Sequence, residues 1–143
     1  MRLAPGEARR RFAEATVARL ASVRPDGAAH LVPVVFVAVL GSDADRILLA
    51  VDPKPKTTRE LARLGNIRAN PSVCVLVDQY EADWQTLWWV RADGLARVID
   101  SGRERDDAIE RLRAKYPQYA TIAGDFGAAI VVTVTRWSSW AAT

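Results

Sequence analysis

Cysteine and histidine are almost absent from this sequence. Its 143 residues include one cysteine, Cys74, and one histidine, His30. A single cysteine excludes an internal disulfide framework and a metal cluster built from several thiolates. Cys74 lies in the apolar run SVCVLVD, where we expect it to be a small buried residue. A hydrolase built on a nucleophile and a neighbouring base is not indicated either.

Long apolar segments and glycine-rich phosphate loops are also missing. The longest apolar run, Leu31 to Leu40, is too short to cross a membrane as a helix. The first residues, MRLAPGEARRRF, contain no apolar core of the kind found in a secretory signal. Neither a Walker-type loop nor a Gly-x-Gly-x-x-Gly motif occurs, so the common nucleotide-binding loops are excluded. We therefore expect a cytoplasmic protein that does not bind a membrane.

Charges of both signs are present and nearly balanced. Lys and Arg number 20 and Asp and Glu number 17, which gives a formal net charge of +3. This small excess suits an anionic small molecule. We do not expect nucleic-acid binding, because the arginines are interspersed with acidic residues, as in GRERDDAIERLR, and form no separate basic face. Half of the residues are hydrophobic, which predicts one globular domain over residues 1–143.

Val-rich segments separated by turn signals predict a mainly β protein with flanking helices, of the α+β class. The turn Pro25–Gly27 joins two such segments as a hairpin. One long strand is expected to be bulged at Gly94. Six strands with tight connections favour an antiparallel β-barrel, closed or nearly closed, with helices outside it. The predicted strands cover 16–23, 29–40, 46–51, 72–80, 87–100 and 128–137, and the predicted helices cover 7–14, 58–68 and 103–116.

Two lysines alternate with two prolines in the segment DPKPKTTREL, residues 52–61. Thr57 and Glu60 fit a capping box that starts a helix, and a helix N-terminus favours anions over cations. Placing Lys54 and Lys56 there is unfavourable unless an anion such as a phosphate binds among them. The prolines reduce the conformational entropy of this loop. The segment therefore indicates a phosphate-binding site, and a solvated basic loop without a ligand is the alternative.

The order of the segments resembles a known family. LASVRPDGAAHLVPVVF, then ILLAVDPKPKTTREL, then NIRANPSVCVLVDQY are arranged as in the split-barrel flavin-binding family that includes pyridoxamine 5′-phosphate oxidase. DPKPKTTRELARLGNIRANP and DWQTLWWVRADGLARV are similar to the actinobacterial deazaflavin branch of that family, whose members use coenzyme F-420. The resemblance covers nearly the whole chain.

The resemblance implies a homodimeric split β-barrel with two cofactor sites in clefts between the subunits. It also implies an oxidoreductase that needs no metal and in which the cofactor transfers hydride to a small organic substrate. The residues implied to contact the cofactor are Lys54, Lys56, Thr57 and Thr58 at its phosphate, Val32, Pro33, Val34, Ala50 and Val51 beside its ring system, and Trp88 and Trp89 contributed by the partner subunit.

Coenzyme F-420 is the cofactor that the resemblance favours, and FMN is the alternative. The arginine and glutamine contacts to FMN in typical members of the family have no recognisable counterpart in this sequence. A protein that binds the cofactor as a carrier, without turnover, is a further alternative.

The sequence contains five tryptophans, a high number for its length. Trp88 and Trp89 are adjacent in a predicted strand, so we expect their side chains on opposite faces. One of them then needs a surface other than the core, which a dimer interface or a flat cofactor would supply. Arg136 is a further candidate for contact with the site.

Overall fold

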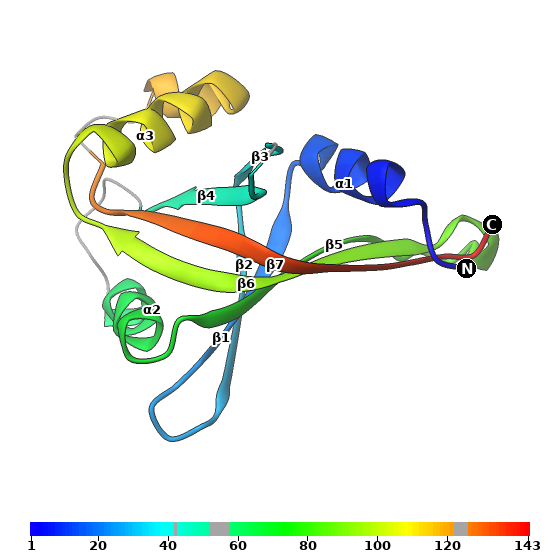
Figure 1. The fold of residues 1–143 in the computed structure, drawn as a ribbon, viewed down its shortest axis with the longest axis horizontal. Helices are drawn as coiled ribbons and strands as arrows, with labels where there is room; N and C mark the ends of the chain where they lie inside the picture. Colours follow the sequence, from blue (N-terminus) through cyan, green and yellow to red (C-terminus); the bar gives the residue numbers. More distant parts are fainter. Residues whose placement is uncertain (42, 52–57, 122–125) are drawn as a thin grey trace.

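Seven strands and three α-helices make up the part of the chain that the structure describes (Figure 1). The structure is a computed structural model that describes residues 1–41, 43–51, 58–121 and 126–143, with the side chains of residues 58–61 left aside. In chain order the elements are α1 (Pro5–Glu14), β1 (Ala18–Val23), β2 (Ala29–Val34), β3 (Val37–Val39), β4 (Arg46–Ala50), α2 (Thr58–Ala69), β5 (Ser72–Gln79), the 3₁₀ helix η1 (Trp84–Thr86), β6 (Trp88–Ile99), α3 (Arg103–Lys115), the 3₁₀ helix η2 (Pro117–Thr121) and β7 (Ala129–Ala141).

The sheet curls because its two edge strands, β2 and β3, follow one another directly in the chain. The strand order is β2–β1–β5–β6–β7–β4–β3, and every neighbouring pair is antiparallel. β2 ends at Val34 and β3 begins at Val37, so a very short connection joins strands at opposite ends of this order. The two edges are thereby brought together, and the sheet becomes a barrel with a seam between β2 and β3. The prediction of an antiparallel split barrel with flanking helices is confirmed.

The prediction of one continuous strand over 29–40 is wrong, because the chain leaves the ladder at Phe36. The backbone N–H of Phe36 donates to the hydroxyl of Tyr116 (3.0 Å), and its carbonyl oxygen accepts from Lys115 Nζ (2.9 Å). The Tyr116 hydroxyl and the Lys115 ammonium replace a neighbouring strand as hydrogen-bond partners of Phe36. β2 therefore ends before Phe36, and β3 begins after it. The described residues therefore form seven strands, one more than predicted.

The other predicted strands and helices agree with the structure to within a few residues at their ends. The predicted bulge is confirmed, since the register between β6 and β7 shifts between Asp93 and Gly94. A Cβ atom built on Gly94 would lie 2.5 Å from the carbonyl oxygen of Thr133. The two strands can approach this closely only because residue 94 has no side chain.

The barrel interior is a continuous apolar core to which the strands contribute alternate side chains. α1 and α2 add Phe12 and Ile67 to the same core, so both helices close the barrel. α3 instead packs on the outside of β4 and β7. Among the described helices, none has the length and apolar character needed to cross a membrane. The most deeply buried strand residues include Leu20, Ile47, Val75, Val90 and Ile130.

An ion pair reinforces the packing of α1. Arg9 donates two hydrogen bonds to Asp45, at 2.7 and 2.8 Å, and the indole N–H of Trp137 donates a third at 2.9 Å. Burial raises the pKa of Asp45, but the hydrogen bonds from Arg9, Trp137 and the backbone N–H of Gly41 outweigh burial and leave that pKa below its usual value. Asp45 is therefore charged and neutralised by Arg9.

Candidate functional site

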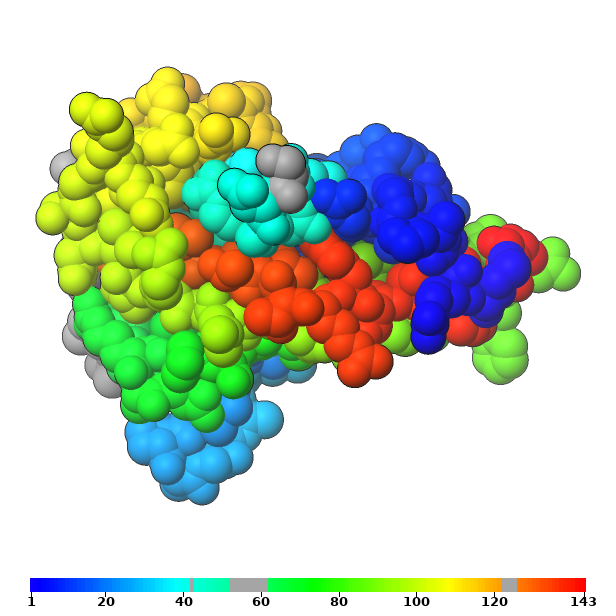
Figure 2. All heavy atoms as spheres, viewed as in Figure 1, coloured from blue at the N-terminus to red at the C-terminus, as the bar shows by residue number. Residues whose placement is uncertain are grey.

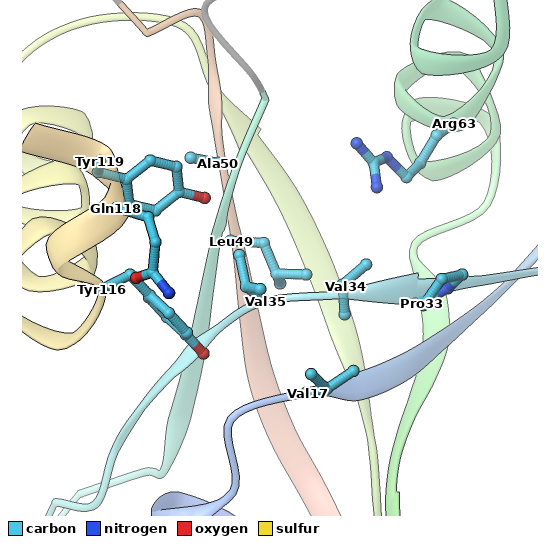
Figure 3. A pocket seen from close by; sticks show the side chains of 10 residues that line it. All are labelled: Val17, Pro33, Val34, Val35, Leu49, Ala50, Arg63, Tyr116, Gln118 and Tyr119. Atoms are coloured by element: carbon cyan, nitrogen blue, oxygen red, sulfur yellow. The ribbon is translucent and has the colours of Figure 1, made fainter. Parts of the chain in front are cut away.

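A cavity of about 460 Å³ lies between the sheet and two helical segments. We call it the main cavity. Its walls come from the ends of β2 and β4, from α2, and from η2 together with Tyr116, which precedes it (Figure 3). Small-molecule sites in proteins occupy roughly 300–1,000 Å³, so the main cavity has the size of such a site.

One side of the main cavity is apolar. Pro33, Val34 and Val35 lie at the end of β2 and in the connection that follows, and Leu49 and Ala50 lie at the end of β4 (Figure 3). No charged side chain interrupts this wall among the described residues. Such a wall excludes water and accepts a ring system.

The polar groups of the main cavity come from the helical segments. Arg63 projects from α2 on one side, and Gln118 and Tyr119 project from η2 on the opposite side (Figure 3). A guanidinium group binds phosphate and carboxylate groups in bidentate fashion, and a side-chain amide both donates and accepts. The main cavity can therefore hold a ligand with an apolar body, an anionic group and a polar edge.

Lys115 and Tyr116 fasten the end of α3 to the barrel beside the main cavity. Lys115 Nζ donates to the carbonyl oxygens of Ala15 (2.7 Å) and Phe36 (2.9 Å), and lies 4.0 Å from the centroid of the Phe36 ring. Burial lowers the pKa of Lys115 to about 8, because the charged form loses its hydration. Burial also raises the pKa of Tyr116. These contacts fix the position of Tyr116 in the cavity wall.

Three of the residues predicted to lie beside a cofactor ring line the main cavity. They are Pro33, Val34 and Ala50. Val32 packs against the barrel core, and Val51 is fully buried in it. The side chains of Val32 and Val51 therefore do not line the main cavity, and their contact with a cofactor stays a prediction.

The predicted phosphate-binding segment adjoins the main cavity in the chain. Ala50 in the cavity wall closely precedes it, and Thr58 is the first residue of α2, which carries the polar wall. Lys54, Lys56 and Thr57 lie outside the described residues. The role of this segment in holding a phosphate therefore stays a prediction.

Trp88 and Trp89 point to opposite faces of β6, as expected. Trp88 packs against the barrel core, and Trp89 lies on the outer face with the guanidinium carbon of Arg91 5.7 Å from its ring centroid. Neither residue lines the main cavity of its own chain. Their predicted contact with a cofactor of the partner subunit stays a prediction. Arg136 lies at a different cavity.

Sequence reasoning missed the helical wall of the main cavity. The predicted helices 58–68 and 103–116 include Arg63 and Tyr116, but neither residue was predicted to belong to a site. A signal for the wall was present in the spacing of Tyr116 and Tyr119 around Pro117, since residues three apart share one side of a helical turn. The signal could not show which strand ends this wall faces. The residues missed are Val17, Arg63, Tyr116, Gln118 and Tyr119.

The family model described as pyridoxamine 5′-phosphate oxidase matches residues 4–141 of this sequence. The chain belongs to the pyridoxamine 5′-phosphate oxidase family. The match spans every strand of the barrel, so the whole described fold is the fold of this family. No match was found among curated proteins.

Solved structures repeat the fold at low sequence identity. A conserved hypothetical protein from Mycobacterium tuberculosis is 19% identical with a TM-score of 0.75, over 98% of this chain and 86% of that one. An FAD-binding protein from Mesorhizobium loti is 18% identical with a TM-score of 0.69, over 97% and 93%. An FAD-binding protein from Mycobacterium smegmatis is 17% identical with a TM-score of 0.63, over 98% and 97%. At these identities the likeness is one of fold.

Proposed function

We propose that this member of the pyridoxamine 5′-phosphate oxidase family is an oxidoreductase that binds a flavin or deazaflavin in the main cavity and transfers hydride to a small organic substrate. The observation that carries the proposal is the position of Pro33, Val34 and Ala50. These residues match the edge that adjoins the cofactor ring in the family, and here they line one wall of a cavity of small-molecule size. Two structures of the same fold are named as FAD-binding proteins.

The side chains that line the main cavity suit a flat ring system with an anionic group attached. The apolar wall holds the ring and keeps water away from it. Arg63 supplies a counter-charge for the anionic group, and the amide of Gln118 supplies a hydrogen-bonding partner for the polar edge of a ring. When bound, a flavin or deazaflavin supplies the hydride-transfer chemistry, and the protein contributes orientation.

The cofactor is tested by parallel titrations of the purified protein with FMN, FAD and coenzyme F-420. We propose coenzyme F-420 as the tightest ligand, on the similarity of residues 52–71 to the deazaflavin branch, with FMN as the alternative. Tight binding of FMN and none of coenzyme F-420 would decide for the alternative. Failure of all three to bind would overturn the proposed function.

Arg63 is tested in the same titration. We expect Arg63→Gln to weaken binding of the cofactor about tenfold or more, because a charge-assisted hydrogen bond is worth roughly 1.5–3 kcal/mol. Arg68→Gln is the matched control, since Arg68 lies on the same helix but is exposed and pairs with Asp100. The Lys54→Ala/Lys56→Ala variant tests the predicted phosphate segment. Equal affinities for all of these proteins would contradict the assignment of the anion-binding groups.

Turnover separates the enzyme from a carrier. The reduced cofactor is mixed with the protein and a panel of small quinones and nitroaromatic acceptors, and its oxidation is followed by absorbance. An enzyme accelerates oxidation in a substrate-dependent way. A protein that binds the cofactor but never changes the oxidation rate is a carrier, and the oxidoreductase proposal would then be withdrawn.

We further propose that the protein forms a homodimer through the outer face of β2, β1, β5 and β6. Apolar side chains of this face are exposed, among them Leu31 in β2, 67% exposed, and Tyr80 just after β5, 59% exposed. A second copy of the chain would bury them and bring its own Trp89 to the interface. Sedimentation velocity tests the proposal: Leu31→Lys is expected to favour the monomer, and Leu40→Lys, after β3, is the control. A monomeric wild-type protein would refute it.

A further inference from the structure

A second cavity, also of about 460 Å³, lies where β6 and β7 meet the N-terminal residues. We call it the arginine cavity, because Arg2, Arg91 and Arg136 line it. It shares no lining residue with the main cavity, so a ligand bound here would lie outside the main cavity of the same chain.

The arginine cavity is built on anchored backbone. The N-terminal ammonium of Met1 donates to the carbonyl oxygen of Ala141 (2.9 Å), and the N–H of Ala141 donates to the carbonyl oxygen of Met1 (2.7 Å). The N–H of Leu3 donates to Ser139 Oγ (3.2 Å). Figure 2 shows the N-terminal residues, in blue, beside the end of β7, in red. Arg2 therefore lies between two residues that are tied to β7.

The lining of the arginine cavity is positively charged. Among the described residues, no aspartate or glutamate lines it. Arg91 has a carboxylate within reach, that of Asp93 at 3.3 Å. Asp45, which accepts from the indole of the lining residue Trp137, is already neutralised by Arg9. Asp93 is also the register partner of Arg136 between β6 and β7, so one carboxylate lies near three arginines, and a bound anion would balance the remaining positive charge.

Aromatic rings lie beside these charges. Trp89 and Trp137 both line the arginine cavity, and the guanidinium of Arg91 lies over the ring of Trp89 at 5.7 Å. Arginine stacks on aromatic rings while its N–H groups remain directed at an anion in the same plane. The cavity thus offers ring contact and anion contact together.

We propose that the arginine cavity binds a small aromatic molecule that carries a carboxylate or a phosphate. The anionic group lies among Arg2, Arg91 and Arg136, and the ring lies against Trp89. A small molecule fits better than a nucleic acid, because the charges line a cavity of limited volume and do not extend as a track along the surface. This second site is separate from the main cavity of the same chain, and Trp89 and Arg91 also lie on the face proposed above for the homodimer.

The test is an NMR titration that follows the indole N–H signals of Trp89 and Trp137, assigned with the Trp89→Phe and Trp137→Phe variants. The probes are phenyl phosphate, benzoate and the neutral benzyl alcohol. We expect both anions to move these signals in a saturable way and benzyl alcohol to bind at least about tenfold more weakly. Comparison of phenyl phosphate with benzoate shows which anionic group the cavity prefers.

Arginine variants then show which guanidinium groups contact the anion. Arg136→Gln and Arg2→Gln are each expected to weaken binding about tenfold, and Arg24→Gln, in the exposed turn between β1 and β2, is the control that leaves it unchanged. Circular dichroism checks that each variant is folded. Equal binding of the neutral probe, or wild-type affinity in both cavity variants, would overturn the proposal.

Two further arms separate this proposal from its alternatives. If a single-stranded oligonucleotide moves the same signals more strongly than phenyl phosphate, with a steep salt dependence, the cavity is part of a nucleic-acid surface and the proposal is wrong. A saturating flavin is expected to leave the phenyl phosphate shifts of the Trp137 indole in place, whereas Trp89 is itself predicted to contact the cofactor of the partner subunit. Loss of flavin binding with these shifts retained would refute only the proposed function, and displacement of phenyl phosphate by the flavin would refute the second site.

Discussion

Helices α1 and α3 both meet the barrel at Phe36, but different forces attach them. From α1, the ring of Phe12 packs with its centroid 5.1 Å from that of Phe36 and with no exposed surface. From α3, Lys115 places its ammonium 4.0 Å from the same ring and donates to the Phe36 carbonyl oxygen. One attachment is therefore mainly apolar, and the other is mainly polar and ionisable.

The comparison separates a contact that stabilises the barrel core, that of α1, from a contact that holds one wall of the main cavity, that of α3. Burial of an apolar ring does not depend on pH, and α1 uses it to close the barrel core. The strength of the α3 attachment changes with the protonation state of one amine, that of Lys115, and this attachment positions Tyr116 in the wall of the main cavity. Elements beside ligand sites are commonly the less stable parts of a protein.

The largest effect is expected from removing the apolar attachment. Phe12→Ala should lower the free energy of unfolding by about 3–5 kcal/mol, because it deletes a fully buried ring and leaves a cavity beside Phe36 and Trp137. Urea unfolding at pH 7 and pH 10 measures this loss in the free energy of unfolding. The loss should be the same at both values, and a loss that changes with pH would contradict an apolar attachment.

A smaller, pH-dependent effect is expected from Lys115→Met. At pH 7 the variant should lose about 1.5–3 kcal/mol, since the charged hydrogen bonds to Ala15 and Phe36 disappear. Burial lowers the pKa of Lys115 in the native state to about 8. The pKa of a lysine in the unfolded chain is about 10.4. Between these values the unfolded state binds more protons, so the stability that depends on this group rises with pH.

The measurement is urea unfolding of the wild type and Lys115→Met at several values between pH 7 and pH 10.5. The difference in unfolding free energy between the two proteins should grow as the pH rises above about 8. A constant difference would show that Lys115 does not titrate in this window. The Phe12→Ala protein, which retains Lys115, should follow the pH dependence of the wild type.

The smallest effect on stability is expected from Tyr116→Phe. The variant removes the hydroxyl that accepts from the N–H of Phe36 and donates to the carbonyl oxygens of Phe36 and Thr16. We expect a cost of about 1 kcal/mol, because the Phe36 carbonyl oxygen keeps Lys115 Nζ as a donor. Hydrogen exchange of the Phe36 amide, followed by NMR, should be clearly faster than in the wild type. Tyr80→Phe, at an exposed tyrosine, is the control. Unchanged exchange would show that Tyr116 does not hold the break between β2 and β3.

Most of the strands and helices could be predicted from the sequence, because alternating apolar residues and turn signals are local features. The break at Phe36 could not be predicted, since the groups that satisfy its backbone belong to Lys115 and Tyr116, far along the chain. The same limit applies to the site. Pro33, Val34 and Ala50 were predicted to lie beside a ligand, and the helical wall that faces them was not.

By itself, the sequence determined the mainly β class, the bulge that Gly94 permits and the opposite directions of Trp88 and Trp89, because each follows from backbone geometry within a few residues. Only the tertiary structure decided that the predicted barrel has seven strands and that its strand ends meet α2 and η2 around one cavity. It alone also brought Arg2 beside Arg91 and Arg136. These are contacts between distant segments, and the packing of the whole chain determines them.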